Sequence, residues 1–255
     1  MTDEERYLFD LRGYVVVPGA IDAETLARMN VWLDAKAEED PKWRGQQDNL
    51  HLDYLLTWND DFRCLLDNPV VLPYLKELMG DQLRLDHDYA IFLQPGGGGL
   101  GLHCGALPYD PSQYYHVFQG RMYSGLTVAV YALTDVPPGM GGFCCVPGSH
   151  RNNFETPASL RSLDPPSEAI VQVPARAGDC VIFTEALLHG TLPWRGPGVR
   201  RTLYFKYSPC HSTWSNATYF PMESNPSGPA VEHLLTERQR ILLDPPGIFQ
   251  HRTVP

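Results

Sequence analysis

Two of the nine histidines, His103 and His189, stand where metal ligands are common. His103 follows the glycine-rich turn QPGGGGLGL, near the start of a strand, and His189 follows the apolar segment CVIFTEALL. Two strands that are distant in sequence can bring such residues together at one open end of a β-barrel. Imidazole nitrogens suit a borderline metal such as Fe(II). The two histidines are therefore the first candidates for a metal site and for the catalytic centre around it.

A candidate anion clamp lies shortly after His189. Thr191 follows His189, and Arg200 begins the segment RRTLYFKYS. A guanidinium that faces the inside of a barrel is costly unless it meets a carboxylate. A bidentate arginine would hold the distal carboxylate of a small diacid. Because strand neighbours point to opposite faces, only one of Arg200 and Arg201 can point inward.

The elements that must position these residues are mostly strands. Helices are predicted over residues 3–11, after the capping Asp22 and in two pieces within 60–80, and a further helix is predicted near 229–243. Between them, short strands alternate with Gly/Pro turns. They include 83–95, 124–136 and the segments GGFCCVPGSH, AIVQVPA, GDCVIFT and RRTLYFKYS. This order predicts one mainly β domain over residues 1–255, a jelly-roll or cupin-like barrel with flanking helices.

Composition excludes several classes of protein. The formal net charge of -10 argues against a binder of nucleic-acid phosphates. No apolar run approaches the length of a membrane span, and the acidic N-terminus MTDEERYLFD lacks a signal-peptide core. The six cysteines form no CxxC motif. We therefore expect free thiols in a reducing cytoplasm, with no membrane and no nucleic-acid partner.

The motifs resemble the phytanoyl-CoA dioxygenase-like family of Fe(II)/2-oxoglutarate oxygenases. The resemblance covers nearly the whole chain and rests on FDLRGYVVVPGAID, RLDHDYAIFLQPG, the Leu102-His103 pair, LTDVPPGMGGFCCVPGSH, ARAGDCVIFTEALLHGTLPW and RRTLYFKYSP. It implies a double-stranded β-helix, with His103 and His189 as iron ligands. It also implies that Arg200, helped by Thr191, binds the cosubstrate 2-oxoglutarate, and that molecular oxygen is consumed.

The chain departs from this family at one ligand. The family usually has His-x-Asp, which gives a facial triad of two histidines and one carboxylate. Here the triplet is His103-Cys104-Gly105, and glycine has no side chain. Three interpretations remain open. The position could accept water or a halide such as chloride, Asp110 could reach in from the following loop, or the protein could bind ligands without turnover.

These features predict a hydroxylase-type oxygenase that acts on a small organic molecule. The alternatives are a halogenase that uses the open position at Gly105, and a non-catalytic ligand-binding barrel. A second His-x-Asp match, His51-Leu52-Asp53, lies before the predicted barrel, in a segment expected to be helix or loop. His87 and His116 are expected in the core or at the surface, and Trp194 is expected to pack at the barrel rim.

Overall fold

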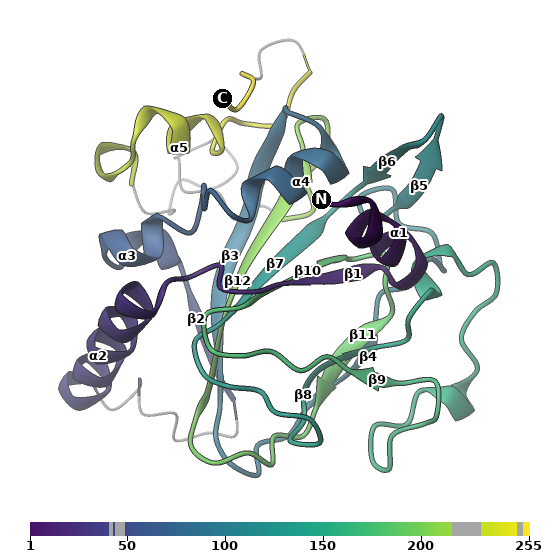
Figure 1. Cartoon of the computed structure of the whole chain (residues 1–255), viewed down its shortest axis with the longest axis horizontal. Coiled ribbons are helices and arrows are strands. Elements are labelled where there is room, and N and C mark those ends of the chain that lie inside the picture. The colour runs from purple at the N-terminus through teal and green to yellow at the C-terminus, as the bar shows by residue number, and fades with distance from the viewer. Residues whose placement is uncertain (41–42, 44–48, 216–230, 249–251) are drawn as a thin grey trace.

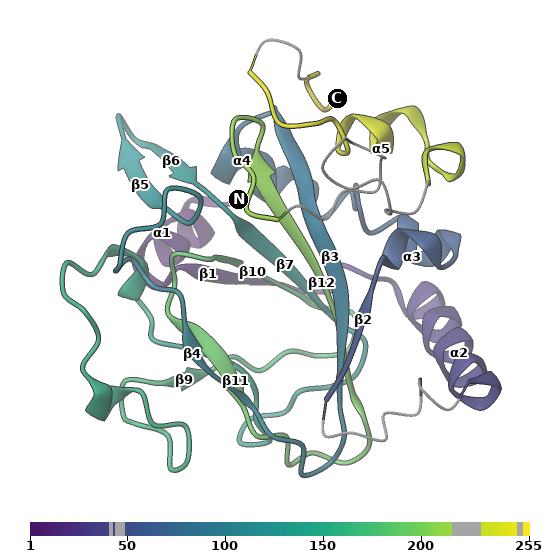
Figure 2. The same cartoon turned by 180° about the vertical axis from the view of Figure 1, so that it is seen from behind.

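Two antiparallel sheets face each other across the body of the protein (Figures 1 and 2). The computed structural model describes residues 1–40, 43, 49–215, 231–248 and 252–255. Strands dominate between residues 83 and 209, as the alternating sequence patterns predict. The predicted fold class, a mainly β double-stranded β-helix with flanking helices, is confirmed.

The larger sheet has six strands in the order β1-β10-β7-β12-β3-β2. Neighbouring strands in this sheet are far apart in sequence, because the chain crosses repeatedly between the two sheets. The strands are β1 (Tyr14–Val17), β2 (Asn49–Asp53), β3 (Leu83–Leu93), β7 (Thr127–Ala132), β10 (Cys180–Thr184) and β12 (Arg200–Pro209).

The smaller sheet carries both candidate histidines. Its order is β4-β11-β8-β9, and a separate pair, β5-β6, projects from one end of the body (Figure 1). The bounds are β4 (Leu100–His103), β8 (Gly142–Cys145), β9 (Val171–Gln172), β11 (His189–Leu192), β5 (Tyr115–Phe118) and β6 (Arg121–Ser124).

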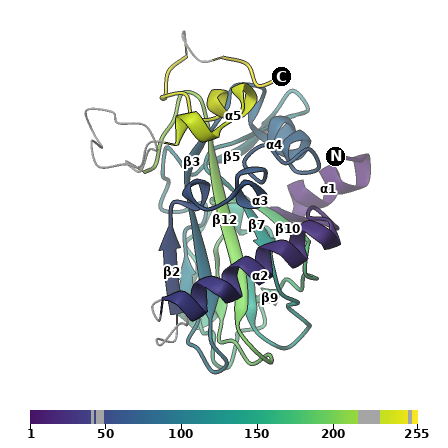
Figure 3. The same ribbon diagram turned by 90° about the vertical axis from the view of Figure 1, so that its left-hand side faces the viewer.

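Helices cover the outer face of the larger sheet (Figure 3). The capping Asp22 accepts hydrogen bonds from the first turn of α2, as predicted. The helices are α1 (Asp3–Arg12), α2 (Ala23–Glu39), α3 (Asp60–Arg63), α4 (Leu72–Met79) and α5 (Glu237–Ile241). Short 3-10 turns span Leu55–Thr57, Ser149–Arg151, Ala158–Leu160 and Glu232–Leu234.

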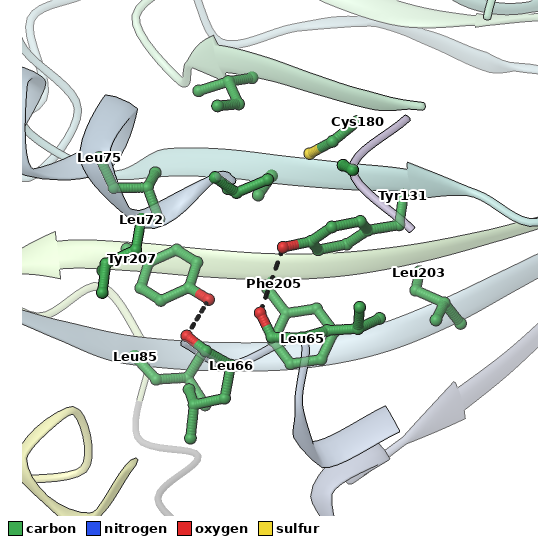
Figure 4. Packing of buried hydrophobic residues seen from close by; sticks show 14 of the residues in the cluster. Leu65, Leu66, Leu72, Leu75, Leu85, Tyr131, Cys180, Leu203, Phe205 and Tyr207 are labelled. Carbon is green, nitrogen blue, oxygen red and sulfur yellow. Dashed lines mark hydrogen bonds between the residues drawn. The ribbon is translucent and has the colours of Figure 1, made fainter. Parts of the chain in front are cut away.

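Alternate residues of the large sheet build two separate cores. On the outer face, Tyr131, Leu203, Phe205 and Tyr207 pack against the helical layer (Figure 4). The hydroxyl of Tyr131 donates to the Leu65 carbonyl, and that of Tyr207 donates to the Leu66 carbonyl. The inner face packs against the small sheet through a second cluster: Val128, Val130, Phe143, Cys145, Val173, Val181, Phe183, Leu187 and Tyr204.

Two sequence predictions differ from the structure. Residues 49–53 were expected in a helix or loop but form the edge strand β2, which pairs with β3. The predicted helix near 229–243 is a 3-10 turn followed by the short helix α5. The backbone is extended at Leu235. The Thr236 hydroxyl then accepts a hydrogen bond from the Gln239 backbone N–H and so caps α5, which begins at Glu237. Residues 229 and 230 lie outside the described residues.

Among the described residues, no helix is long and apolar enough to cross a bilayer.

Candidate metal and cosubstrate site

His103 and His189 face each other across two paired strands. His103 ends β4, His189 begins β11, and the two are register partners in the antiparallel ladder. Their ring centroids lie 4.3 Å apart. The rings of Phe143 and Phe183 pack against His189 and restrict its rotation. The structure thus brings together the two histidines that the sequence singled out.

Backbone carbonyls fix the orientation of both imidazoles. Nδ1 of His103 donates to the Gly101 carbonyl at 2.9 Å, and Nδ1 of His189 donates to the Leu187 carbonyl at 2.7 Å. These bonds place the proton on Nδ1 and leave the lone pair on Nε2. Burial also lowers the pKa of His189 to about 4. His189 is therefore neutral at ordinary pH, as a metal ligand must be.

The imidazoles open onto a cavity of about 280 Å³ between the two sheets. Aromatic rings form much of its wall, and charged or polar groups line other parts of it. The lining residues include His51, Tyr89, Ile91, Leu100, His103, Phe143, Phe183, Glu185, His189, Thr191, Tyr204 and Lys206. Such a cavity can hold a small molecule beside the histidines.

Cys104, rather than Gly105, points its side chain toward the histidines. Cys104 has a positive φ of 60°, and its Sγ lies within 4.8 Å of ligand atoms of His103 and His189. A Cβ added to Gly105 would instead meet Leu188 and the Leu107 carbonyl at 3.6–3.8 Å. An aspartate at Gly105 would thus be strained, because φ is +107°.

A buried ion pair lies beside the histidines. Glu185 occupies the turn between β10 and β11, and its Oε1 accepts from Nζ of Lys206 on β12 at 2.6 Å. Its Oε2 accepts from the Cys104 thiol at 3.1 Å and lies 4.0 Å from Nε2 of His189. Burial alone would raise the pKa of Glu185, but the Lys206 ammonium and His189 hold it at about 2. A permanent carboxylate therefore adjoins the two imidazoles.

Arg200 is buried with part of its guanidinium unsatisfied. The residue is 1% exposed, and within the described chain its Nε and Nη1 have no hydrogen-bond partner. It packs against Gly142 of β8, where a Cβ would come within 3.2 Å of Nε. A buried guanidinium with idle N–H groups is costly and suits an incoming carboxylate. Arg201 points outward, to Asn30 and Asp34 of α2.

Thr191 and Arg200 occupy different parts of this site. Thr191 lines the cavity, two residues beyond His189 on β11, whereas Arg200 is buried against Gly142 of β8. The pairing of Thr191 with Phe143, and of Leu192 with Gly142, puts Arg200 and Thr191 at the same end of the small sheet. Two imidazoles with free Nε2 atoms, a carboxylate and a partly unsatisfied guanidinium fit a divalent transition metal with a small diacid.

The other candidate residues have structural partners. Oδ1 of Asp110 accepts from the backbone N–H and the hydroxyl of Ser112, so this carboxylate closes a turn. His51 on β2 bonds Asp53 and stacks on Tyr89 at the cavity wall. His87 pairs with Asp86 and stacks on Trp214, His116 is exposed on β5, and Trp194 packs against Leu93 and Val136.

Sequence reasoning missed Glu185 and Lys206. Both are charged residues inside apolar segments, FTEALLHG and LYFKYSP. A charge in such a segment is a signal, because a buried ion must find a partner. The sequence could therefore have marked each residue as unusual. The pairing of Glu185 with Lys206 could not be predicted from the sequence, because it depends on strands β10 and β12 both bordering β7.

A family model described as phytanoyl-CoA dioxygenase (PhyH) matches residues 9–202, which is most of the chain. The chain belongs to this family. One curated relative, Dioxygenase af480 from Aspergillus fumigatus, is 25% identical over 198 residues. That match covers 74% of this chain and 60% of the relative's length.

Solved structures agree with this family membership. HygX from Streptomyces hygroscopicus, with nickel and 2-oxoglutarate bound, is 26% identical with a TM-score of 0.75. The match covers 84% of this chain and 90% of HygX. Other HygX structures hold iron, or hygromycin B with nickel and 2-oxoglutarate. SnoK, a non-heme α-ketoglutarate-dependent carbocyclase from nogalamycin biosynthesis, shares the fold at 20% identity, 99% and 94% coverage and a TM-score of 0.63.

Proposed function

We propose that this chain is an Fe(II)/2-oxoglutarate-dependent oxygenase that acts on a small organic molecule as one catalytic domain. The observation that carries the proposal is the pairing of His103 with His189. Both histidines line the cavity with Nε2 free, and Arg200 at the start of β12 is buried and partly unsatisfied. The family membership and the metal and 2-oxoglutarate held by HygX support the same assignment.

Each residue of the site has its own role in this proposal. His103 and His189 would bind the iron, and Arg200 with Thr191 would bind the carboxylate of 2-oxoglutarate that lies away from the metal. Bound iron and 2-oxoglutarate supply the activation of molecular oxygen for oxidation of a C–H bond. The chain orients the substrate against Tyr89 and Tyr204, and the apolar rings of Phe143 and Phe183 keep water away from the histidines.

Hydroxylation is favoured over halogenation. A halide would have to sit beside the two histidines, where the Glu185 carboxylate already places a negative charge. Like charges at close range repel each other in a buried site. The unsatisfied Arg200 in turn favours an enzyme over a barrel that has lost its cosubstrate.

We place the enzyme in a reducing compartment such as the cytoplasm. The support comes from the cysteines, all of which are free, including the buried neighbours Cys144 and Cys145. The cavity between aromatic walls suits a small-molecule substrate.

The test is turnover of 2-oxoglutarate by the iron-loaded protein. We expect oxygen uptake with formation of succinate, measured by an oxygen electrode and mass spectrometry, with wild type compared against His189→Ala. Incubation with candidate substrates and bromide follows. A product that carries bromine would show that the enzyme is a halogenase, and wild-type turnover by His189→Ala would refute the metal assignment.

A further inference from the structure

A second cavity adjoins the one that His103 and His189 line. Its volume is about 420 Å³, and three residues line both cavities: His51, Tyr89 and Lys206. We call the cavity beside the histidines the inner cavity and this one the outer cavity. The remaining residues that line the outer cavity have no part in the proposed metal and cosubstrate site. They are Asp53, Tyr54, His87, Asp88, Trp214 and Ser215.

Strand register explains why the two cavities lie side by side. Tyr89 on β3 pairs with Asp53 of β2 and with Tyr204 of β12, and His87 pairs with Lys206. Side chains of register partners project from the same face of a sheet. The inner face of β2, β3 and β12, three neighbours in the large sheet (Figure 2), therefore forms one floor below both cavities. A ligand in the inner cavity can extend along this floor.

A row of nearly parallel rings runs along the floor. The centroids of His51 and Tyr89 lie 4.7 Å apart, and those of Tyr89 and His87 lie 5.8 Å apart. His87 then stacks on Trp214 at 5.3 Å, with the ring planes 25° apart. Stacked aromatic rings attract each other beyond the gain from burial alone. A further flat ring can therefore continue this row.

Trp214, the last ring of the row, is exposed and yet firmly placed. The residue is 52% exposed, so burial alone stabilises its position little. The buried carboxylate of Asp86 accepts from the backbone N–H of Trp214 at 2.9 Å and from that of Ser215 at 3.0 Å. Hydrogen bonds to an ionised acceptor are strong. Such an anchor suits an exposed ring that is held in place for a ligand.

The inner cavity alone is small for the proposed reaction. Its volume of about 280 Å³ has to accommodate iron, 2-oxoglutarate and the reacting part of the substrate. Pockets for a single small ligand commonly measure about 300–1,000 Å³. The outer cavity offers the additional room that the rest of a substrate needs.

The charged groups of the outer cavity favour hydrogen-bond donors on the ligand. Oδ1 of Asp53 accepts from Nε2 of His51 at 2.9 Å, and this carboxylate is 61% exposed, so it can accept from a ligand as well. The Lys206 ammonium is already paired with Glu185. An anionic ligand would thus meet the Asp53 charge without a free cation at Lys206, whereas a hydroxyl or an ammonium group can donate to Asp53.

We propose that the outer cavity binds a flat, uncharged or cationic ring of the substrate that carries hydroxyl or amino groups on its edge. Trp214 is then a specificity-determining residue. This inference rests on the proposed function, because the ring places the rest of the same molecule beside His103 and His189. An aromatic ring and the C–H face of a sugar ring share this shape, and the experiment separates the two.

The experiment follows the full chain, labelled with fluorotryptophan, by fluorine NMR without added metal. The chain has five tryptophans, and the spectrum of Trp214→Phe assigns the Trp214 signal. The probes are benzyl alcohol and methyl glucoside. We expect at least one of them to shift the Trp214 signal saturably and to leave the other four signals in place. Benzyl alcohol alone identifies an aromatic ring, methyl glucoside alone identifies a sugar, and no saturable shift with either overturns the proposal.

Benzoate tests the charge of the ligand. We expect it to bind more weakly than benzyl alcohol, because its carboxylate meets Asp53 at the same rim. Benzoate that binds more tightly than both uncharged probes would refute the proposed ligand class.

Trp214→Ala tests the ring itself. We expect the dissociation constant of the bound probe to rise at least about fivefold, measured by ligand-observed NMR. The matched control is Phe118→Ala, which removes a 60% exposed ring on β5 and should leave probe affinity unchanged. Circular dichroism checks that both variants are folded. Wild-type probe affinity in Trp214→Ala would overturn the role of Trp214.

The outcomes separate this inference from the proposed function. Trp214→Ala should bind metal and 2-oxoglutarate like wild type, since Trp214 does not line the inner cavity, and His189→Ala should bind the probes like wild type. If no probe reaches Trp214 while His189→Ala loses metal, this inference fails and the proposed function stands. If His189→Ala keeps wild-type metal affinity, the proposed function fails, whatever the probes show.

Discussion

The two faces of the large sheet differ in how their buried polar groups are satisfied. On the outer face, buried polar groups are matched: the Tyr131 and Tyr207 hydroxyls each find a backbone carbonyl in the segment 65–66. On the inner side lie the buried Glu185–Lys206 pair and the unsatisfied guanidinium of Arg200. Unmatched buried polar atoms are costly. The outer face is thus arranged for stability, whereas Arg200 on the inner side has N–H groups that a ligand can satisfy.

The largest effect should come from the histidines of the inner face. His189→Ala and His103→Ala each remove an oriented Nε2, and we expect metal binding to fall below detection in calorimetry. Thermal unfolding of the metal-free variants should stay close to that of wild type. Wild-type metal content in either variant would contradict the site.

Arg200→Ala should weaken binding of 2-oxoglutarate by about 3–5 kcal/mol, because a buried carboxylate loses its charged partner. Since Arg200 has idle N–H groups without ligand, the free protein should lose little stability or gain some. The matched control is Arg201→Ala, which faces α2 and should leave 2-oxoglutarate affinity unchanged. If Arg201→Ala is the more sensitive variant, Arg200 is not the clamp.

Leu203→Ala tests the outer face. Leu203 is fully buried in the helix-covered core, and its truncation should lower the free energy of unfolding by about 3 kcal/mol. Denaturant titration measures this loss. The turnover per folded molecule should not change. A fall in metal affinity would show that the two faces are coupled.

Tyr207→Phe should give the smallest effect. It removes the hydroxyl that donates to the Leu66 carbonyl but keeps the ring, so we expect a loss of about 1 kcal/mol in unfolding free energy. Activity should be unaffected. A loss near zero would mean that water or another donor satisfies the Leu66 carbonyl in the variant.

The same contrast explains which features could be predicted from the sequence. The helix that starts after Asp22 and the strands around 83–93 and 200–209 follow from local patterns, namely a capping residue and strand-like segments bounded by turns. The pairing of His103 with His189 was inferred from their context, through the resemblance to a family. Edge strand β2 was missed, because NLHLD is short and its exposed alternation is weak.

The part of the site that no local pattern shows is the neighbourhood of Glu185. Its contacts reach Cys104 on one side and Lys206 on the other, and each comes from a different strand or strand end. Such contacts depend on strand order and on the positive φ of Cys104. Neither can be obtained from composition or spacing, so the sequence could mark the charge as unusual but could not name its partners.

The place of His103 on β4 has a mechanical consequence. Among the described residues, β4 is the outermost strand of the small sheet and pairs only with β11, across a register shift between His189 and Thr191. Such an edge opens more readily than the sheet interior. An ion bound by both histidines would hold β4 and β11 together. Proteolytic cleavage in the neighbouring turn at Gly96–Gly99 should then become slower as the metal concentration rises, since the ion binds only the closed edge.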